Sequence, residues 1–208
     1  MSAQPVALPE SAGALLTDAD ALARVQDAFA PPADARVAAS IEIEIEVAGE
    51  GTFTLTYDDG ALTGDEGMAD EPFFSCESPK GAWPFVRTVL EQALAGFPRA
   101  PAIAARVATA RGLSTSLQET ALSGLTKLEG AACEIDVVGV GVFRIARGPL
   151  DEAVRKAKVA IAKDAILKLL DGAPLSSVGG VKVAGDTRLP GDVVAALGPV
   201  WIALSRER

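Results

Sequence analysis

The chain has 208 residues, of which 49% are hydrophobic and 23% are charged, and its formal net charge is −9. This is the composition of a globular protein with enough apolar residues to bury a core. The negative charge argues against nucleic acid and anionic membrane surfaces as partners. No uncharged run has the length of a membrane span, and the first nine residues do not resemble a signal peptide, so residence in the cytoplasm is expected.

The N-terminal part of the chain is predicted to contain one helix. Residues 1–17 are rich in Ala, Pro and Ser and are expected to form a loose segment. Asp18 or Thr17 can cap a helix that runs to about Phe29, where two prolines follow and end it.

A β-hairpin is the clearest local prediction. Residues 40–47 alternate strictly between apolar and polar side chains, and residues 52–57 alternate again after a turn with two glycines. Alternation places all apolar side chains of a strand on one face, so Glu42, Glu44 and Glu46 are expected on the outer face. The two alternating segments therefore predict two antiparallel strands.

Several elements are predicted between this hairpin and residue 128. An acidic loop is expected to about Pro72, followed by a short strand at 73–77 and a helix over 83–95. Two more helices are predicted at 101–111 and 115–128. The acidic loop is a weak candidate for calcium because its spacing does not match an EF-hand.

The pattern of the first hairpin returns ninety residues later. Segment 133–145 aligns with segment 43–55 without a gap, and six of the thirteen positions are identical, where background composition gives about one. A helix is predicted after each hairpin, at 83–95 and at 164–170. We interpret this as an internal duplication into halves 18–112 and 113–208, which are free to pack as one domain. The alternative is that two unrelated Gly-x-Gly hairpins look alike.

Much familiar enzyme chemistry is absent from the sequence. The chain has no histidine, which removes Ser-His and Cys-His nucleophile pairs and the usual zinc sites. Cys76 and Cys133 are expected to be reduced core residues. The Gly-Val-Gly turn at 139–141 lacks the third glycine of a dinucleotide loop and lies in a hairpin. No catalytic residue, metal or cofactor is predicted, although a buried carboxylate pair stays open as an enzymatic alternative.

The C-terminal third has a recognisable order of features. A strand around 158–162 precedes the helix and Gly of Asp164–Gly172, then Gly-Val-Lys-Val-Ala-Gly-Asp at 180–186 and a last apolar helix at 190–197. This order resembles the sterol carrier protein type-two lipid-binding domain over about 113–198, and in part over 18–96. The resemblance implies an α+β fold, with a mainly antiparallel curved sheet covered by helices on one face. It also implies an apolar tunnel for a fatty acyl chain or a sterol.

The tunnel would have mostly apolar walls. The wall residues that the resemblance implies are Phe53, Trp83, Phe85, Leu90, Phe143, Ile166, Leu170 and Val183. Two departures from the family pattern would shrink or close it: the charged stretch 151–158 after the second hairpin, and the lack of a clear Gly-Asp strand in the first half. The leading interpretation is non-catalytic binding of an apolar small molecule. The alternative is a structural or interaction module with a filled core and an acidic surface, and a homodimer is left open.

Overall fold

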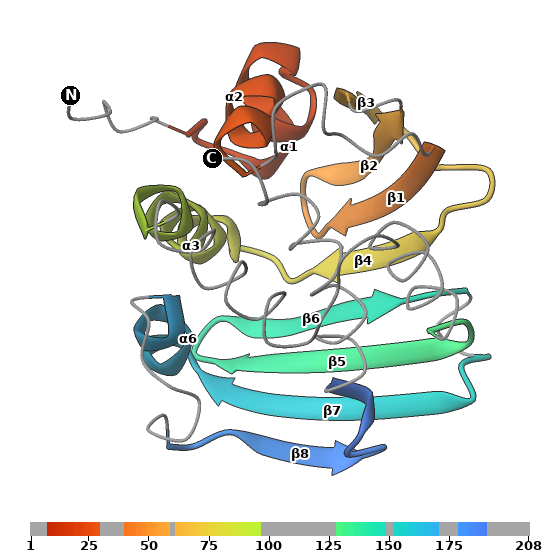
Figure 1. The fold of residues 1–208 in the computed structure, drawn as a ribbon, viewed down its shortest axis with the longest axis vertical. Coiled ribbons are helices and arrows are strands. Elements are labelled where there is room, and N and C mark those ends of the chain that lie inside the picture. The colour runs from red at the N-terminus through yellow and green to blue at the C-terminus, as the bar shows by residue number, and fades with distance from the viewer. Residues whose placement is uncertain are drawn as a thin grey trace, which may run out of the picture.

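Alternating segments of the sequence become strands of one mixed sheet in the computed structural model of the chain (Figure 1). The structure describes residues 8–29, 40–58, 61–96, 128–148, 152–170 and 179–190. Its elements are α1 (Ala12–Leu16), α2 (Ala19–Phe29), β1 (Ser40–Val47), β2 (Gly51–Asp58), β3 (Ala61–Glu66), β4 (Phe74–Ser78), α3 (Trp83–Gly96), β5 (Ala131–Val138), β6 (Gly141–Ala146), β7 (Arg155–Ala162), α6 (Lys163–Leu170) and β8 (Lys182–Gly185).

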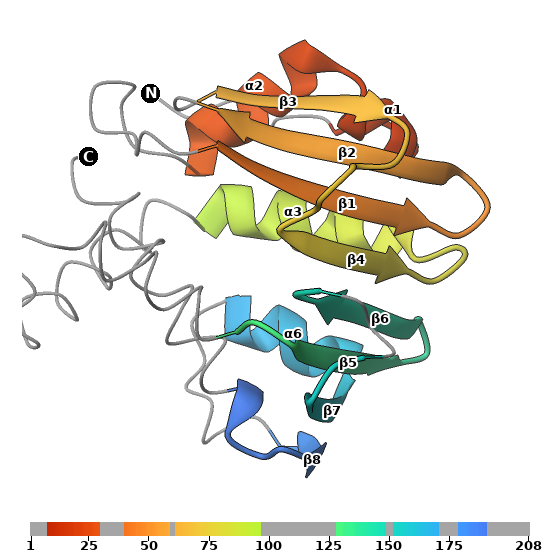
Figure 2. The same ribbon diagram turned by 90° about the vertical axis from the view of Figure 1, so that its right-hand side faces the viewer.

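The eight strands follow the order β3-β2-β1-β4-β6-β5-β7-β8. Among these strands, five of the seven pairings are antiparallel, and β1–β4 and β5–β7 are parallel. The prediction of an α+β fold with a mainly antiparallel sheet is therefore confirmed. Strand β4 pairs with β6, which makes the sheet continuous between the two predicted halves (Figure 2).

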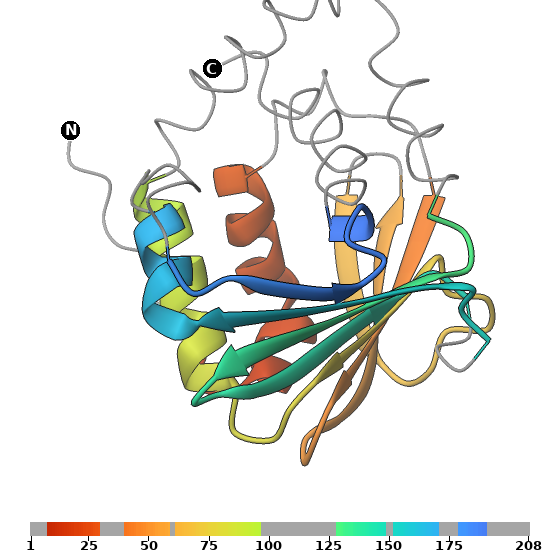
Figure 3. The same ribbon diagram turned by 90° about the horizontal axis from the view of Figure 1, so that it is seen from below.

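The described helices lie on the concave side of the curved sheet (Figure 3). Helices α1 and α2 pack against the end of the sheet formed by β2 and β3, while α3 and α6 pack against each other. A core cluster under α1 and α2 contains Leu15, Leu16, Leu22 and Phe53, all of them buried. The alternation of β2 supplies Phe53 to this cluster, because its side chain lies on the concave face.

The N-terminal segment differs from the expectation of a loose chain. Ser11 caps α1 by accepting a hydrogen bond from the amide of Ala14 at 3.1 Å. Leu8, Leu15 and Leu16 are buried in the core cluster under α1 and α2. A helix of five residues has little stability of its own, so α1 depends on packing against the sheet, which local sequence patterns do not reveal. The predicted cap of α2 is confirmed, since Asp18 accepts hydrogen bonds from two backbone amides.

The predicted acidic loop after β2 is wrong in part, because residues 61–66 form the edge strand β3. The sequence of β3 has no alternating apolar pattern, and Leu62 is its one residue that packs against the core cluster. Gly64 contributes by having no side chain, since a Cβ there would overlap the carbonyl oxygen of Leu16. An edge strand of this kind is placed by its neighbours rather than by its own hydrophobicity.

The other predicted elements have the following outcomes. Strand β1 has the predicted bounds, and β2, β4, α3, β5, β6, β7, α6 and β8 lie within a few residues of the predictions. Helix α6 begins at Lys163, which places Asp164 in the first turn rather than at the cap. The helices predicted at 101–111, 115–128 and 190–197 lie almost entirely outside the described residues.

The two hairpins have the same register at the ninety-residue offset. Val47 pairs with Gly51, and Val137 pairs with Gly141. In both turns the amide of the fourth residue donates to the carbonyl of the first at 2.9 Å, namely Glu50 to Val47 and Val140 to Val137. The connecting glycines Gly49 and Gly139 have φ angles of 92° and 83°, a conformation that favours glycine.

The strands around the hairpins are also arranged alike. In each half the first hairpin strand, β1 or β5, has an antiparallel partner on one side and a parallel partner on the other. The parallel partner, β4 or β7, leads into a helix, α3 or α6. The units β2-β1-β4 and β6-β5-β7 therefore have the same local topology and lie side by side in one sheet.

Candidate functional site

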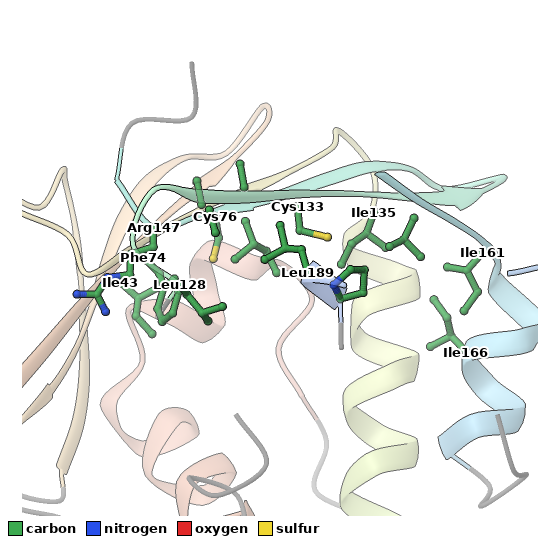
Figure 4. Close-up of a pocket in the computed structure, with 16 residues that line it drawn as sticks. Ile43, Phe74, Cys76, Leu128, Cys133, Ile135, Arg147, Ile161, Ile166 and Leu189 are labelled. Atoms are coloured by element: carbon green, nitrogen blue, oxygen red, sulfur yellow. The ribbon is translucent and has the colours of Figure 1, made fainter. Parts of the chain in front are cut away.

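An apolar cavity of about 400 Å³ lies on the concave face of the sheet (Figure 4). We call it the main cavity. Its lining residues come from five strands, from α6 and from the segments beside them: Ile43, Phe74, Cys76, Leu128, Ala131, Ala132, Cys133, Ile135, Ile145, Ala146, Arg147, Val159, Ile161, Ile166, Leu189 and Pro190. Its volume lies within the range of small-molecule sites in proteins.

Strand alternation explains why these side chains converge. Cys76 on β4 and Cys133 on β5 both pair with Ile145 on β6, so all three lie in one row across the sheet. In Figure 4 both cysteine side chains point into the cavity from the sheet, and Ile166 approaches from α6. The cavity floor is thus built from one face of neighbouring strands, with the helix at its side.

The main cavity is elongated along the strands. One end lies at Arg147, whose amide donates to the carbonyl of Ala131 at 2.9 Å. The other end lies at Ile161, which pairs with Val137, six residues along β5 from Ala131. At ~3.3 Å per residue, the distance between these levels is about 20 Å. This length suits an extended chain molecule.

A second, smaller cavity adjoins the main cavity, and we call it the side cavity. Its volume is about 260 Å³, and it lies between helices α1 and α3 and strands β1, β4 and β6. Trp83, Leu90 and Phe143 are among its lining residues. Cys76 and Ile145 line both cavities, so the two spaces meet at the β4–β6 pairing that joins the two units of the sheet.

The wall residues implied by the sequence are divided among several places. Ile166 lines the main cavity, and Trp83, Leu90 and Phe143 line the side cavity. Three others line neither cavity: Phe53 is 4% exposed in the core under α1, Phe85 packs with the cluster of Val137 and Ile161, and Val183 is 39% exposed on β8. The prediction for Leu170 concerns a side chain outside the described part of the chain.

The strand residues that form the aliphatic floor of the main cavity are not among the predicted wall residues. Ile135, Val159 and Ile161 come from β5 and β7, whose concave faces carry the odd-numbered residues. That period of two is visible in the sequence. Strand parity would have identified these residues.

The two cysteines are free thiols in an apolar setting. Burial raises the pKa of Cys76 to about 11. The pKa of Cys133 is also raised, first by burial and then by the charge of Glu134. Both thiols are therefore protonated at neutral pH and are poor nucleophiles. With one strand between them their Cα atoms are about 10 Å apart, beyond the ~7 Å limit for a disulfide.

A row of charged side chains crosses the outer, convex face of the sheet behind the cavity floor. Arg144 contacts Glu77 at 2.7 Å and Glu134 at 3.7 Å, and Lys158 contacts Glu134 at 2.7 Å. We call these four residues the charge row; they join β4, β6, β5 and β7. The pKa of Glu134 is lowered, mainly by the hydrogen bond from Lys158. The charge row therefore stabilises the ionised form of this carboxylate where the two units meet.

The described residues contain no group of three or more His, Cys, Asp or Glu side chains placed to hold a metal ion. No helix in the same part of the chain is long and apolar enough to cross a membrane. Comparisons with protein-family models, curated proteins and solved structures find no match to the chain.

Proposed function

We propose that the chain binds an apolar small molecule, a fatty acyl or sterol-like compound, in the main cavity without chemically changing it. The observation that carries this proposal is the cavity of about 400 Å³ with an almost wholly apolar lining. Apolar cavities of ~150 Å³ already take up benzene from water, so a space more than twice as large has room for a longer ligand. Removing the ligand's apolar surface from water supplies the free energy of binding.

We further propose that the fold is sterol-carrier-like and arose by duplication of one unit. The support is the shared hairpin register, the matching glycine turns and the same order of neighbouring strands and helix. Two unrelated hairpins have no reason to agree in all three respects. In this proposal each unit supplies strands to both cavities, because the main cavity includes Ile43 of β1 and the side cavity includes Phe143 of β6.

A binding role is favoured over catalysis by the chemistry of the cavity lining. The two thiols have raised pKa values, so thiolate is scarce at neutral pH. No carboxylate is among the described residues of the lining, and the sequence has no histidine. The lining thus offers contact surface for a ligand rather than a nucleophile paired with a base.

Native mass spectrometry combined with thermal unfolding tests this function. The protein is first extracted with organic solvent and refolded, then incubated separately with palmitate, hexadecanol and cholesterol. The proposal predicts a mass adduct and a raised Tm with at least one of them, because a ligand that binds only the folded state stabilises it. Neither effect with any of the three would overturn the proposal and favour a module that acts through its surface.

A further inference from the structure

The main cavity and the side cavity form one forked space. They share Cys76 on β4 and Ile145 on β6, which pair with each other in the sheet. Beyond this pair the main cavity continues over β5 and β7 to Ile161, and the side cavity continues over β1 to Val47. We call these two continuations the branches of the fork. Cys133 also pairs with Ile145 and points into the cavity, so it lies beside the point where the branches part (Figure 4).

The side chain of Phe143 lies between the two branches. Its strand, β6, stands between β4 and β5 in the sheet. Phe143 lines the side cavity, whereas its partner on β5, Ile135, lines the main cavity. Phe143 also packs against the buried cluster of Val137 and Ile161, as does Phe85 of α3. These contacts keep the branches separate beyond the shared pair.

Each branch lies over one of the two repeated units of the sheet. Ile45 of β1 lines the side cavity, and Ile135, its equivalent at the ninety-residue offset, lines the main cavity. Helix α3 follows β4 and contributes Leu90 to the side cavity, and helix α6 follows β7 and contributes Ile166 to the main cavity. The same arrangement of strand and helix, present twice, thus forms two apolar branches.

We propose that the forked space binds a lipid with two hydrocarbon chains, a diacylglycerol, and places one chain in each branch. This inference rests on the proposed function, since both chains bind by leaving water for apolar surroundings. A single chain in the main cavity leaves the side cavity, with its volume of about 260 Å³, without a ligand. The uncharged head of a diacylglycerol suits a lining that is almost wholly apolar, because a charge buried without a partner costs free energy.

Isothermal titration calorimetry tests this inference with dioctanoylglycerol and monooctanoylglycerol, which have the same head and differ by one chain. The wild type should bind dioctanoylglycerol at least about one hundredfold more tightly, because each buried CH₂ of the second chain adds to the affinity. I45F puts a phenyl ring into the side cavity and should lower this ratio at least about tenfold by weakening dioctanoylglycerol. Its affinity for monooctanoylglycerol should stay nearly the same, since the branch beside α6 is still open.

The matched control is E46F, which puts the same ring on the exposed outer face of the same strand. E46F should keep the wild-type ratio. V86F is a second variant, which fills the side cavity from α3 and should act like I45F. It supplies the test if I45F does not fold, and a raised Tm with palmitate reports that either variant is folded and still binds a single chain.

The outcomes separate this inference from the proposed function. A smaller ratio in the wild type, or an unchanged ratio in both I45F and V86F, would overturn the binding of a two-chain lipid and leave single-chain binding in the main cavity in place. If the wild type binds neither glyceride and none of palmitate, hexadecanol and cholesterol, the proposed function fails and this inference fails with it.

Discussion

Replacing Cys133 by phenylalanine should abolish ligand binding by dividing the main cavity. Cys133 lies on β5 between the ends at Arg147 and Ile166, and its side chain points into the space (Figure 4). The cavity of about 400 Å³ has room for a phenyl ring, since ~150 Å³ is enough for benzene. The ring would lie about 7 Å from the Arg147 end of a path about 20 Å long. The variant should therefore fold, but an extended chain should no longer fit.

The size of the effect follows from mass action. A ligand at one hundred times its Kd stabilises the folded state by about 2.7 kcal/mol. For a chain of this length, each kcal/mol raises Tm by about 2–4 °C, so palmitate should raise the wild-type Tm by about 5–11 °C. C133F should show a shift below about 1 °C because it has no site left.

Differential scanning fluorimetry with and without palmitate measures these shifts. The matched control is D136F, which puts the same ring on the exposed outer face of the same strand. D136F should keep the full ligand shift. A full shift in C133F, or a loss of the shift in both variants, would refute the assignment of the ligand to the concave face.

Three further predictions concern the charge row and the thiols. R144M should lower the free energy of unfolding, measured in urea, by about 1 kcal/mol, because it removes the partner of Glu77 and Glu134 from a half-exposed network. An unchanged free energy of unfolding would show that the charge row does not stabilise the fold. The pKa of Glu134 is lowered by Lys158 and Arg144, so the stabilisation from this carboxylate is present above its ordinary pKa of 4.5 and is lost as the pH falls through its lowered pKa. In urea titrations, E134Q should have a lower free energy of unfolding than wild type, and this difference should shrink below pH 4.5. A difference that does not change with pH would show that it does not arise from the charge of Glu134. With a pKa of about 11, Cys76 should react with iodoacetamide at pH 8 far more slowly in the folded protein than in urea, and equal rates would show that the thiol is not buried.

The strands could be predicted wherever one face is apolar. Residues 40–47 alternate so regularly that the bounds of β1 follow directly from the period of two, and the repeated hairpin predicted β5 and β6. These patterns predicted antiparallel hairpins, and the mainly antiparallel sheet with helices on one face was an expectation from the resemblance to the sterol carrier domain. Local periodicity is informative because each of these strands contributes several side chains to the interior.

Elements that depend on distant partners could not be predicted. Helix α1 is short and owes its stability to burial of Leu15 and Leu16, and β3 has Leu62 as its main inward contact. The sequence also did not specify that β4 pairs with β6, because strand order depends on which edges meet in space. In these three cases tertiary contacts, and not the conformational preference of the local sequence, determine the structure.

The candidate site could be predicted only in part for a related reason. Four of the eight predicted wall residues are aromatic, and one of these, Phe53, fills the core under α1 rather than a cavity. The floor of the main cavity includes side chains that are smaller than aromatic ones, such as Ile135 and Cys133. Large side chains usually fill the interior, and a cavity forms only where the side chains around a space do not fill it. The sequence alone does not show which parts of the interior are filled.

The most direct test of the account is an isotope-filtered NMR experiment on the protein bound to uniformly carbon-labelled palmitate. The account predicts nuclear Overhauser contacts from the hydrocarbon tail to the methyl groups of Ile135, Ile161 and Ile166, which line the main cavity. Contacts to exposed apolar residues such as Met68 and Val154, without any to the three isoleucines, would contradict a ligand site on the concave face of the sheet.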